Sequence, residues 1–180
     1  SSDLQNQQPV EIKEYQGKTL DKVKSTGKIV IGVRTSYMPL SYTETFKEDG
    51  KPLGYAVDIC NNIVDKYKLQ NGLQNVSTQY VFVSAKNRLD KVRSGEVDLE
   101  CGSTTNNADR RKRVDFSIPY YVAGVKILAR KGEGIESITD IKGKKVAVGK
   151  GTSTVKIVER LNKERLLNLS TIEEKDFPSA

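Results

Sequence analysis

Short β-branched runs alternate with amphipathic segments along the first two thirds of the chain, and no other feature restricts the possible fold as much. The runs at 28–33, 78–83 and 97–102 predict three strands, and the first of these, KIVIGV, is typical of a buried one. The segments between and after them predict helices at 54–69, 87–95 and 108–114. A loop or hairpin is expected at 41–54, where Asp49 precedes Gly50. This order predicts a parallel α/β sheet with right-handed crossovers.

The pattern restarts after a candidate linker at 116–119, which indicates a second α/β unit. Its expected elements are a long strand at 120–131, a short helix at 137–143, a strand at 144–151, a helix at 152–167 and a strand at 169–174. We therefore expect two lobes, lobe 1 at 18–116 and lobe 2 at 117–180, after a flexible polar leader at 1–17.

The composition excludes several classes of function. The formal net charge is +7, but lysine and arginine are interleaved with aspartate and glutamate, which argues against nucleic-acid binding. Histidine is absent, which removes His general bases and most zinc and copper sites, and we expect neither a metal nor a cofactor. Cys60 and Cys101 are interpreted as two buried free thiols, with one disulfide in an oxidising compartment as the alternative. No apolar run approaches the ~20 residues that cross a membrane.

Hydroxyl and guanidinium groups follow each predicted strand of the first unit. They are Arg34 after the first strand, Ser84 and Arg88 after the second, and Ser103, Thr105 and Arg110 after the third. Ligands of open α/β sheets bind outside the carboxyl ends of the strands, and parallel strands direct these ends to one edge. The sequence therefore predicts that three arginines and several hydroxyl groups converge on one cleft.

These residue types suit an anionic ligand. An arginine side chain carries a planar fork of donors that matches a carboxylate and stays charged at any working pH. Hydroxyl groups and backbone N–H groups at a helix start add further donors. The run ECGSTTNNADRRKR at 100–113 combines both features. The alternative is an ordinary N-cap and turn cluster followed by solvated arginines.

The second unit carries GKGTST at 149–154, between a predicted strand and a predicted helix. A phosphate-binding loop needs G-x-x-x-x-G-K-[ST], and here Gly151 occupies the Ser/Thr position, so nucleotide triphosphate binding is rejected. Free N–H groups of Thr152 and Ser153, with the Thr152 hydroxyl nearby, could still hold a carboxylate. A plain N-cap is the alternative interpretation.

Four segments together resemble a known family: GKIVIGVRTSYMPLSY, GYAVDICNNIV, AKNRLDKVRSGEVDLECGSTTNNADRRKRVDFSIPYY and ITDIKGKKVAVGKGTSTVKIVERLN. The chain resembles the periplasmic solute-binding proteins of polar amino-acid uptake systems, family 3, and most of all their glutamate/aspartate-binding subgroup. The resemblance implies an α/β, two-lobed periplasmic-binding-protein-like fold, with the second lobe incomplete in this chain because relatives are longer. It also implies a monomeric, secreted, periplasmic or membrane-associated receptor, its signal peptide removed, which delivers its ligand to the membrane permease of an ABC transporter.

The resemblance implies two groups of contacts with an amino-acid ligand. Arg110, with the backbone and hydroxyls around Ser103 and Thr105, would hold the α-carboxylate and the amine. Thr152 and Ser153 would reach the carboxylate from the other lobe.

The second group concerns the ligand side chain. Arg34, with Arg88 and Ser84, would favour an acidic side chain, and Tyr37 would pack against the ligand. The Asn-Arg pair at 87–88 also occurs in relatives of broad specificity, so a general polar amino-acid binder or a sensor domain stays open. A dehydratase-type enzyme on the same scaffold is a further alternative, although the sequence shows no candidate general acid in the cleft.

Overall fold

A computed structural model describes residues 18–174 of the 180-residue chain, and the leader expected at 1–17 lies outside this range. The helices are α1 (Lys18–Thr26), α2 (Tyr55–Gln70), α3 (Arg88–Ser94), α4 (Ala108–Arg111), α5 (Ser153–Glu164) and the 3-10 helix η1 (Ile138–Ile141). The strands are β1 (Lys28–Val33), β2 (Ser36–Tyr37), β3 (Ser41–Thr43), β4 (Pro52–Leu53), β5 (Ser77–Phe82), β6 (Leu99–Cys101), β7 (Lys145–Gly149) and β8 (Ser170–Glu174). Within this range, no helix is long and apolar enough to span a membrane.

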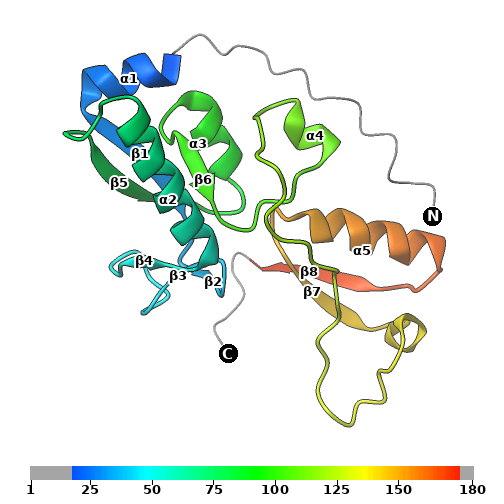
Figure 1. Ribbon diagram of the computed structural model, residues 1–180. Helices are drawn as coiled ribbons and strands as arrows, with labels where there is room; N and C mark the ends of the chain where they lie inside the picture. Colours follow the sequence, from blue (N-terminus) through cyan, green and yellow to red (C-terminus); the bar gives the residue numbers. More distant parts are fainter. Residues whose placement is uncertain (1–17, 175–180) are drawn as a thin grey trace, which may run out of the picture.

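The first sheet is parallel and has β1 at its centre, in the order β5-β1-β6 (Figure 1). The three strands that the sequence predicts are therefore confirmed: the bounds of β1 agree, and those of β5 and β6 differ by one or two residues. Ile29, Ile31 and Val33 alternate along β1 and are buried on one face of the sheet, against Val23 of α1 and Val57 of α2. Burying each such side chain stabilises the fold by about 1.5–3 kcal/mol.

The segment expected as a loop or hairpin at 41–54 forms β3 and β4, which join β2 in a small antiparallel sheet. Ser41 and Thr43 of β3 are fully buried, and Ser41 Oγ accepts a hydrogen bond of 2.9 Å from the Arg34 backbone N–H. This contact fixes the chain where it leaves β1. Gly54, just before α2, has a φ of 123°, and a Cβ there would lie 2.5 Å from the Leu40 carbonyl oxygen.

The two cysteines form a disulfide, with a Cα–Cα distance of 6.3 Å. The preferred interpretation of two free thiols is therefore wrong. Cys60 lies on the apolar face of α2, and Cys101 pairs with Val33 in the sheet beneath that helix. The packing of α2 on the sheet brings together two residues that are 41 positions apart in the sequence.

Reduction of this disulfide is expected to lower the free energy of unfolding substantially. Chain-entropy estimates give about 4 kcal/mol for a closed loop of this length. Urea unfolding with and without a thiol reductant measures the change, and a variant that carries both Cys60→Ser and Cys101→Ser should not respond to the reductant. An unfolding midpoint that the reductant leaves in place for the unaltered protein would contradict the expectation.

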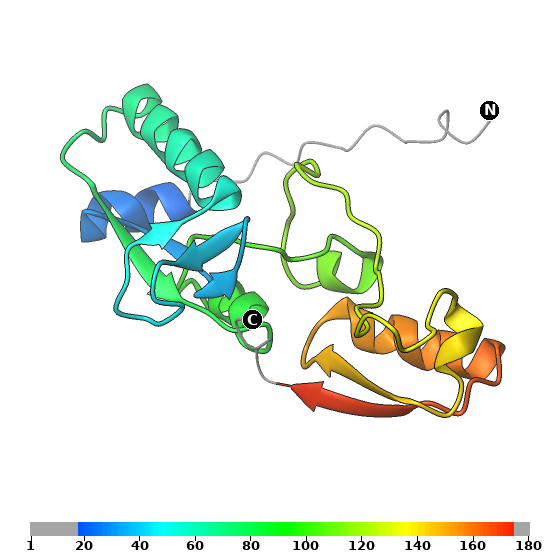
Figure 2. The same ribbon diagram turned by 90° about the horizontal axis from the view of Figure 1, so that it is seen from below.

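The second sheet consists of β7 and β8, which run parallel, with α5 on one face (Figures 1 and 2). The strand, helix and strand predicted over 144–174 are confirmed, and η1 lies where a short helix is expected. The long strand predicted at 120–131 is wrong, because this segment has no regular secondary structure. Its β-branched residues have strand propensity, but within residues 18–174 no strand pairs with it, and Val122 and Leu128 are exposed.

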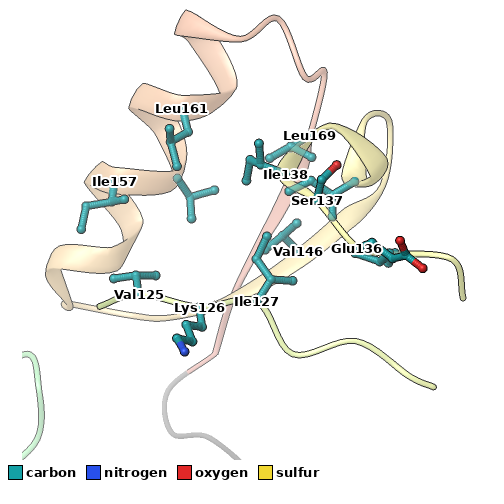
Figure 3. Close-up of a pocket in the computed structure, with 13 residues that line it drawn as sticks. Val125, Lys126, Ile127, Glu136, Ser137, Ile138, Val146, Ile157, Leu161 and Leu169 are labelled. Atoms are coloured by element: carbon teal, nitrogen blue, oxygen red, sulfur yellow. The ribbon is translucent and has the colours of Figure 1, made fainter. Parts of the chain in front are cut away.

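The irregular segment and α5 enclose an apolar pocket of about 390 Å³ in the second unit. Figure 3 shows side chains from α5, from the 125–127 stretch and from β7 around this space, among them Ile157, Leu161, Ile127 and Val146. No arginine lines the pocket. It is therefore distinct from the site that the strand ends predict.

Candidate functional site

Arg34 lies directly after the central strand β1 and is 3% exposed. The guanidinium carbon of Arg34 is 5.0 Å from the centroid of the Tyr37 ring, which is a cation–π contact. Tyr37 lies on β2 and is half-buried. The short antiparallel sheet thus holds an aromatic ring against a buried cation at the carboxyl end of β1.

Arg88 is the first residue of α3 and is also 3% exposed. The turn before it is stabilised by Ser84 and Asn87, whose backbone N–H groups each donate to the other's side chain, at 2.8 and 3.2 Å. Burial lowers the pKa of Arg88 to about 10, an effect that Glu100 opposes. The Arg88 side chain therefore stays a cation at neutral pH.

Arg110 lies in the short helix α4, whose N-cap Asn107 accepts a 3.0 Å hydrogen bond from the Arg110 backbone N–H. Its guanidinium donates to the carbonyl oxygen of Thr105 at 2.9 Å and to that of Gly151 at 3.5 Å. The second contact reaches the loop before α5 in the other unit. Burial lowers the pKa of Arg110, and the carboxylate of Glu100 opposes this effect.

The loop between β6 and α4 also meets the start of α5. The hydroxyl groups of Thr105 and Ser153 lie 3.2 Å apart, and Ser103 is half-buried in the same loop. Thr152 differs from the expectation, because both its N–H and its hydroxyl donate to the Gly149 carbonyl oxygen, at 3.3 and 2.7 Å. The Thr152 N–H is therefore not free for a ligand.

The structure brings the three strand-end arginines into one electrostatic cluster. The pKa of Arg88 is lowered by Arg110 and by Arg34 in addition to burial. The three guanidinium groups therefore lie close enough for their charges to act on one another, as expected for side chains that follow parallel strands. Ser84 lies at the edge of this cluster, and the hydroxyls of Thr105 and Ser153 lie where the two units meet.

Two groups in the site were missed from the sequence. Glu100 lies within β6, and burial raises the pKa of its carboxyl group, against the opposing effect of the nearby arginines. A charged residue inside a predicted strand of the sheet is the signal that could have found it. Tyr120 donates from its hydroxyl to the Gly102 carbonyl, and its ring packs edge-on to Tyr55 with centroids 6.1 Å apart. The sequence does not reveal its role, because the pattern at 120–131 predicts a strand.

Two α/β units meet where Arg110 and Thr105 of the first contact Gly151 and Ser153 of the second, an arrangement typical of two-lobed binding proteins. Residues 29–174 match the bacterial extracellular solute-binding proteins, family 3, and the chain belongs to this family. Its fold is the periplasmic-binding-protein-like α/β fold.

Individual relatives agree with this assignment. The chain is 38% identical to the L-glutamate/L-aspartate-binding protein of Pseudomonas aeruginosa, over 93% of the chain and 55% of that protein. It is 36% identical to the glutamate/aspartate import solute-binding protein of Escherichia coli, over 89% of the chain and 52% of that protein. The chain thus spans about half the length of these curated relatives.

A solved structure of an ancestral amino-acid-binding protein, a precursor of cyclohexadienyl dehydratase, shares the fold. The TM-score is 0.68 at 27% identity, with 88% of this chain and 65% of that chain covered.

Proposed function

We propose that the protein is an extracytoplasmic receptor that binds an acidic L-amino acid, glutamate or aspartate, between its two units. The observation that carries this proposal is the cluster of Arg34, Arg88 and Arg110, of which the first two are each 3% exposed. Burial of the Arg88 cation costs free energy unless an anion compensates it, and its buried Nε and Nη1 have no hydrogen-bond partner within residues 18–174. A ligand with a second carboxylate would supply such a charge.

The α-carboxylate of the ligand would bind Arg110, with the hydroxyl groups of Ser103 and Thr105 as further partners. From the second unit, Ser153 and the Thr152 loop would complete this contact. The division of the chain into lobes near residue 117 belongs to the same proposal, since the ligand would lie between them. Closure of the lobes excludes water and strengthens each ionic contact.

The side chain of the ligand would face Arg34 and Arg88, with Ser84 beside them. Tyr37 would pack against the ligand while holding the Arg34 guanidinium in place. Micromolar affinity requires about −8 kcal/mol, and hydrogen bonds to charged groups contribute about 1.5–3 kcal/mol each. Three arginines can meet this requirement for a glutamate-sized ligand.

The proposed partner is the membrane permease of an ABC transporter, and the proposed location is the periplasm or the outer face of the membrane, with the signal peptide removed. Both proposals rest on the family and on relatives named as import solute-binding proteins. The Cys60–Cys101 disulfide supports this location, because disulfides persist in oxidising compartments. We propose a monomer.

We propose that the protein is not an enzyme. The relatives at 36–38% identity are named as binding proteins. A dehydratase on this scaffold would need a positioned acid or base, and the buried carboxyl group of Glu100, near the arginines, could fill such a role. Turnover of prephenate or arogenate by the purified protein would overturn the proposal.

Calorimetric titration with the twenty common amino acids tests the proposed function. We expect micromolar dissociation constants for L-glutamate or L-aspartate, and at least about tenfold weaker binding of the corresponding amides. A response to glutamine or a basic amino acid, with none to glutamate or aspartate, would refute the acidic-ligand proposal.

The close approach of the two units at Gly151 gives a further prediction. A Cβ at Gly151 would lie 3.2 Å from the backbone carbonyl atoms of Ala85, and Gly151 has a φ of 75°. Gly143 has a similar φ of 73°, but a Cβ there would meet nothing within 4 Å. Both Gly→Ala changes should lower stability similarly, by about 1 kcal/mol, since both place an L-residue in the left-handed region.

Gly151→Ala alone should also lower ligand affinity, because its methyl group holds the two units apart. We expect a loss of roughly tenfold, equivalent to about 1.4 kcal/mol. Thermal unfolding and calorimetric titration of Gly151→Ala and Gly143→Ala separate the two effects. Equal affinities in the two variants would show that this contact does not matter for binding.

A further inference from the structure

Glu100 occupies a defined position in the arginine cluster. It pairs with Gly32 in the register of β6 and β1, while the next residue along, Cys101, pairs with Val33 in the core. Successive side chains in a strand point to opposite faces, so Glu100 lies on the face opposite Cys101. A Cβ on Gly32 would lie 3.6 Å from Glu100 Cγ, which places both on the same face.

The two oxygen atoms of the Glu100 carboxylate differ in their hydrogen bonding. Its Oε2 accepts a 2.7 Å hydrogen bond from the Thr104 hydroxyl. Its Oε1 is buried and has no hydrogen-bond partner within residues 18–174. A Cβ at Gly102 would lie 2.6 Å from this Oε1 and 3.3 Å from Arg34 Cγ, so the absence of a side chain at Gly102 lets the two charged side chains flank it.

The same three arginines that form the proposed ligand site act on Glu100. Burial raises the pKa of its carboxyl group, and Arg88, the Thr104 hydroxyl, Arg34 and Arg110 oppose the rise, in decreasing order. Arg88 in turn has its buried Nε and Nη1 without hydrogen-bond partners in the described part of the chain. The Glu100 carboxylate, with one unpaired oxygen, therefore lies within the electrostatic influence of the unpaired donors of Arg88.

We propose that Glu100 is the built-in counter-anion of the arginine cluster, and that its charge limits how strongly the site prefers a dicarboxylic amino acid over the corresponding amide. This proposal rests on the proposed function for its ligand. Without a ligand, Glu100 reduces repulsion among the three guanidiniums. When a ligand side-chain carboxylate enters, it meets the attraction of the arginines and the repulsion of Glu100 together.

Glu100 is thus a positioning residue that affects selectivity. Comparing a ligand that has a side-chain charge with one that has none tests this role. Replacing Glu100 by Gln removes the negative charge while keeping the size of the side chain. Affinity for glutamate should then rise by roughly tenfold or more, as expected for the loss of one like charge within about 12 Å at an effective dielectric constant of about 20. Affinity for glutamine should change little, because this ligand carries no side-chain charge.

The experiment compares the unaltered protein with Glu100→Gln, Glu100→Asp and Glu96→Gln by calorimetric titration of L-glutamate and L-glutamine. Glu100→Asp keeps the charge and should keep the ratio of the two affinities. Glu96 is exposed and paired with Lys91, so Glu96→Gln controls for the change in net charge. Thr104→Val removes the hydrogen bond that stabilises the Glu100 carboxylate, and it should shift the ratio in the same direction as Glu100→Gln by a smaller factor.

A second measurement tests the role of Glu100 without an amino-acid ligand. Sulfate is the probe, and thermal unfolding of each variant is measured with and without millimolar sulfate. If Glu100 neutralises the cluster, sulfate should stabilise Glu100→Gln more than Glu100→Asp, Glu96→Gln or the unaltered protein. If the unaltered protein binds neither glutamate nor glutamine, the proposed function fails, and the sulfate result still decides whether Glu100 is the counter-anion.

Two results would overturn the proposal. One is an equal change in glutamate and glutamine affinity in Glu100→Gln, which indicates a merely structural role. The other is a sulfate effect that is the same in all variants. If Glu100→Gln does not fold, the affinity ratio in Thr104→Val decides, and an unchanged ratio there counts against the proposal.

Discussion

Arg110→Ala is expected to abolish measurable binding of every amino-acid ligand, acidic or neutral. The α-carboxylate is common to all of them, and we propose that Arg110 pairs with it at the junction of the two units. Two charge-assisted hydrogen bonds at about 1.5–3 kcal/mol each correspond to a loss of roughly 100-fold or more. Calorimetric titration with L-glutamate and L-glutamine measures the loss.

Arg111→Ala is the matched control for this change. Arg111 lies in the same short helix, but it is exposed and donates to the Asn106 side chain at 2.8 Å. The Arg111→Ala substitution should leave the affinities for glutamate and glutamine near those of the unaltered protein. Thermal unfolding should show that Arg110→Ala and Arg111→Ala both fold. Retention of glutamate binding in Arg110→Ala would rule out Arg110 as the holder of the α-carboxylate.

Arg34→Ala is expected to remove the preference for acidic ligands while leaving general amino-acid binding. Arg34 is buried beside Tyr37 at the end of β1, where the ligand side chain would lie. Loss of one charge-assisted contact corresponds to a decrease in glutamate affinity of roughly 10- to 100-fold, whereas glutamine should lose much less. The ratio of the two dissociation constants is the quantity to measure, with thermal unfolding as the check on folding.

Comparison of the two variants distinguishes the proposed role of Arg110 from that of Arg34. Arg110→Ala should weaken both ligands, and Arg34→Ala mainly glutamate. If Arg34→Ala weakened glutamate and glutamine by the same factor, separate recognition of the α-carboxylate and the side chain would be refuted.

Much of the fold and part of the site could be predicted from local patterns. The β-branched run at 28–33 specifies a buried strand by itself, and the rule that parallel strands end at one edge was enough to bring Arg34, Arg88 and Arg110 together. The register between strands was not accessible, because it depends on packing between distant segments. The position of Glu100 opposite Gly32 follows from that register, and the Cys60–Cys101 disulfide follows from the packing of α2 on the sheet.

The strand that is wrongly predicted at 120–131 shows a second limit of prediction from sequence. Its sequence has the same propensity as the true strands, but a strand also needs a neighbour for its backbone hydrogen bonds, and propensity does not supply one. The prediction that the Thr152 N–H is free to bind a ligand is also wrong, because local sequence does not show which acceptor the group finds. Thr152 is the N-cap of α5, as one interpretation held, but its donors turn back to the Gly149 carbonyl.

A crystal structure of the protein with L-glutamate tests most directly whether the arginine cluster is a binding site for one dicarboxylic ligand. We expect electron density for the ligand between the two units, with its α-carboxylate on Arg110 and its side-chain carboxylate toward Arg34 and Arg88. Density for glutamate elsewhere, or a ligand whose side chain points away from both Arg34 and Arg88, would contradict the account.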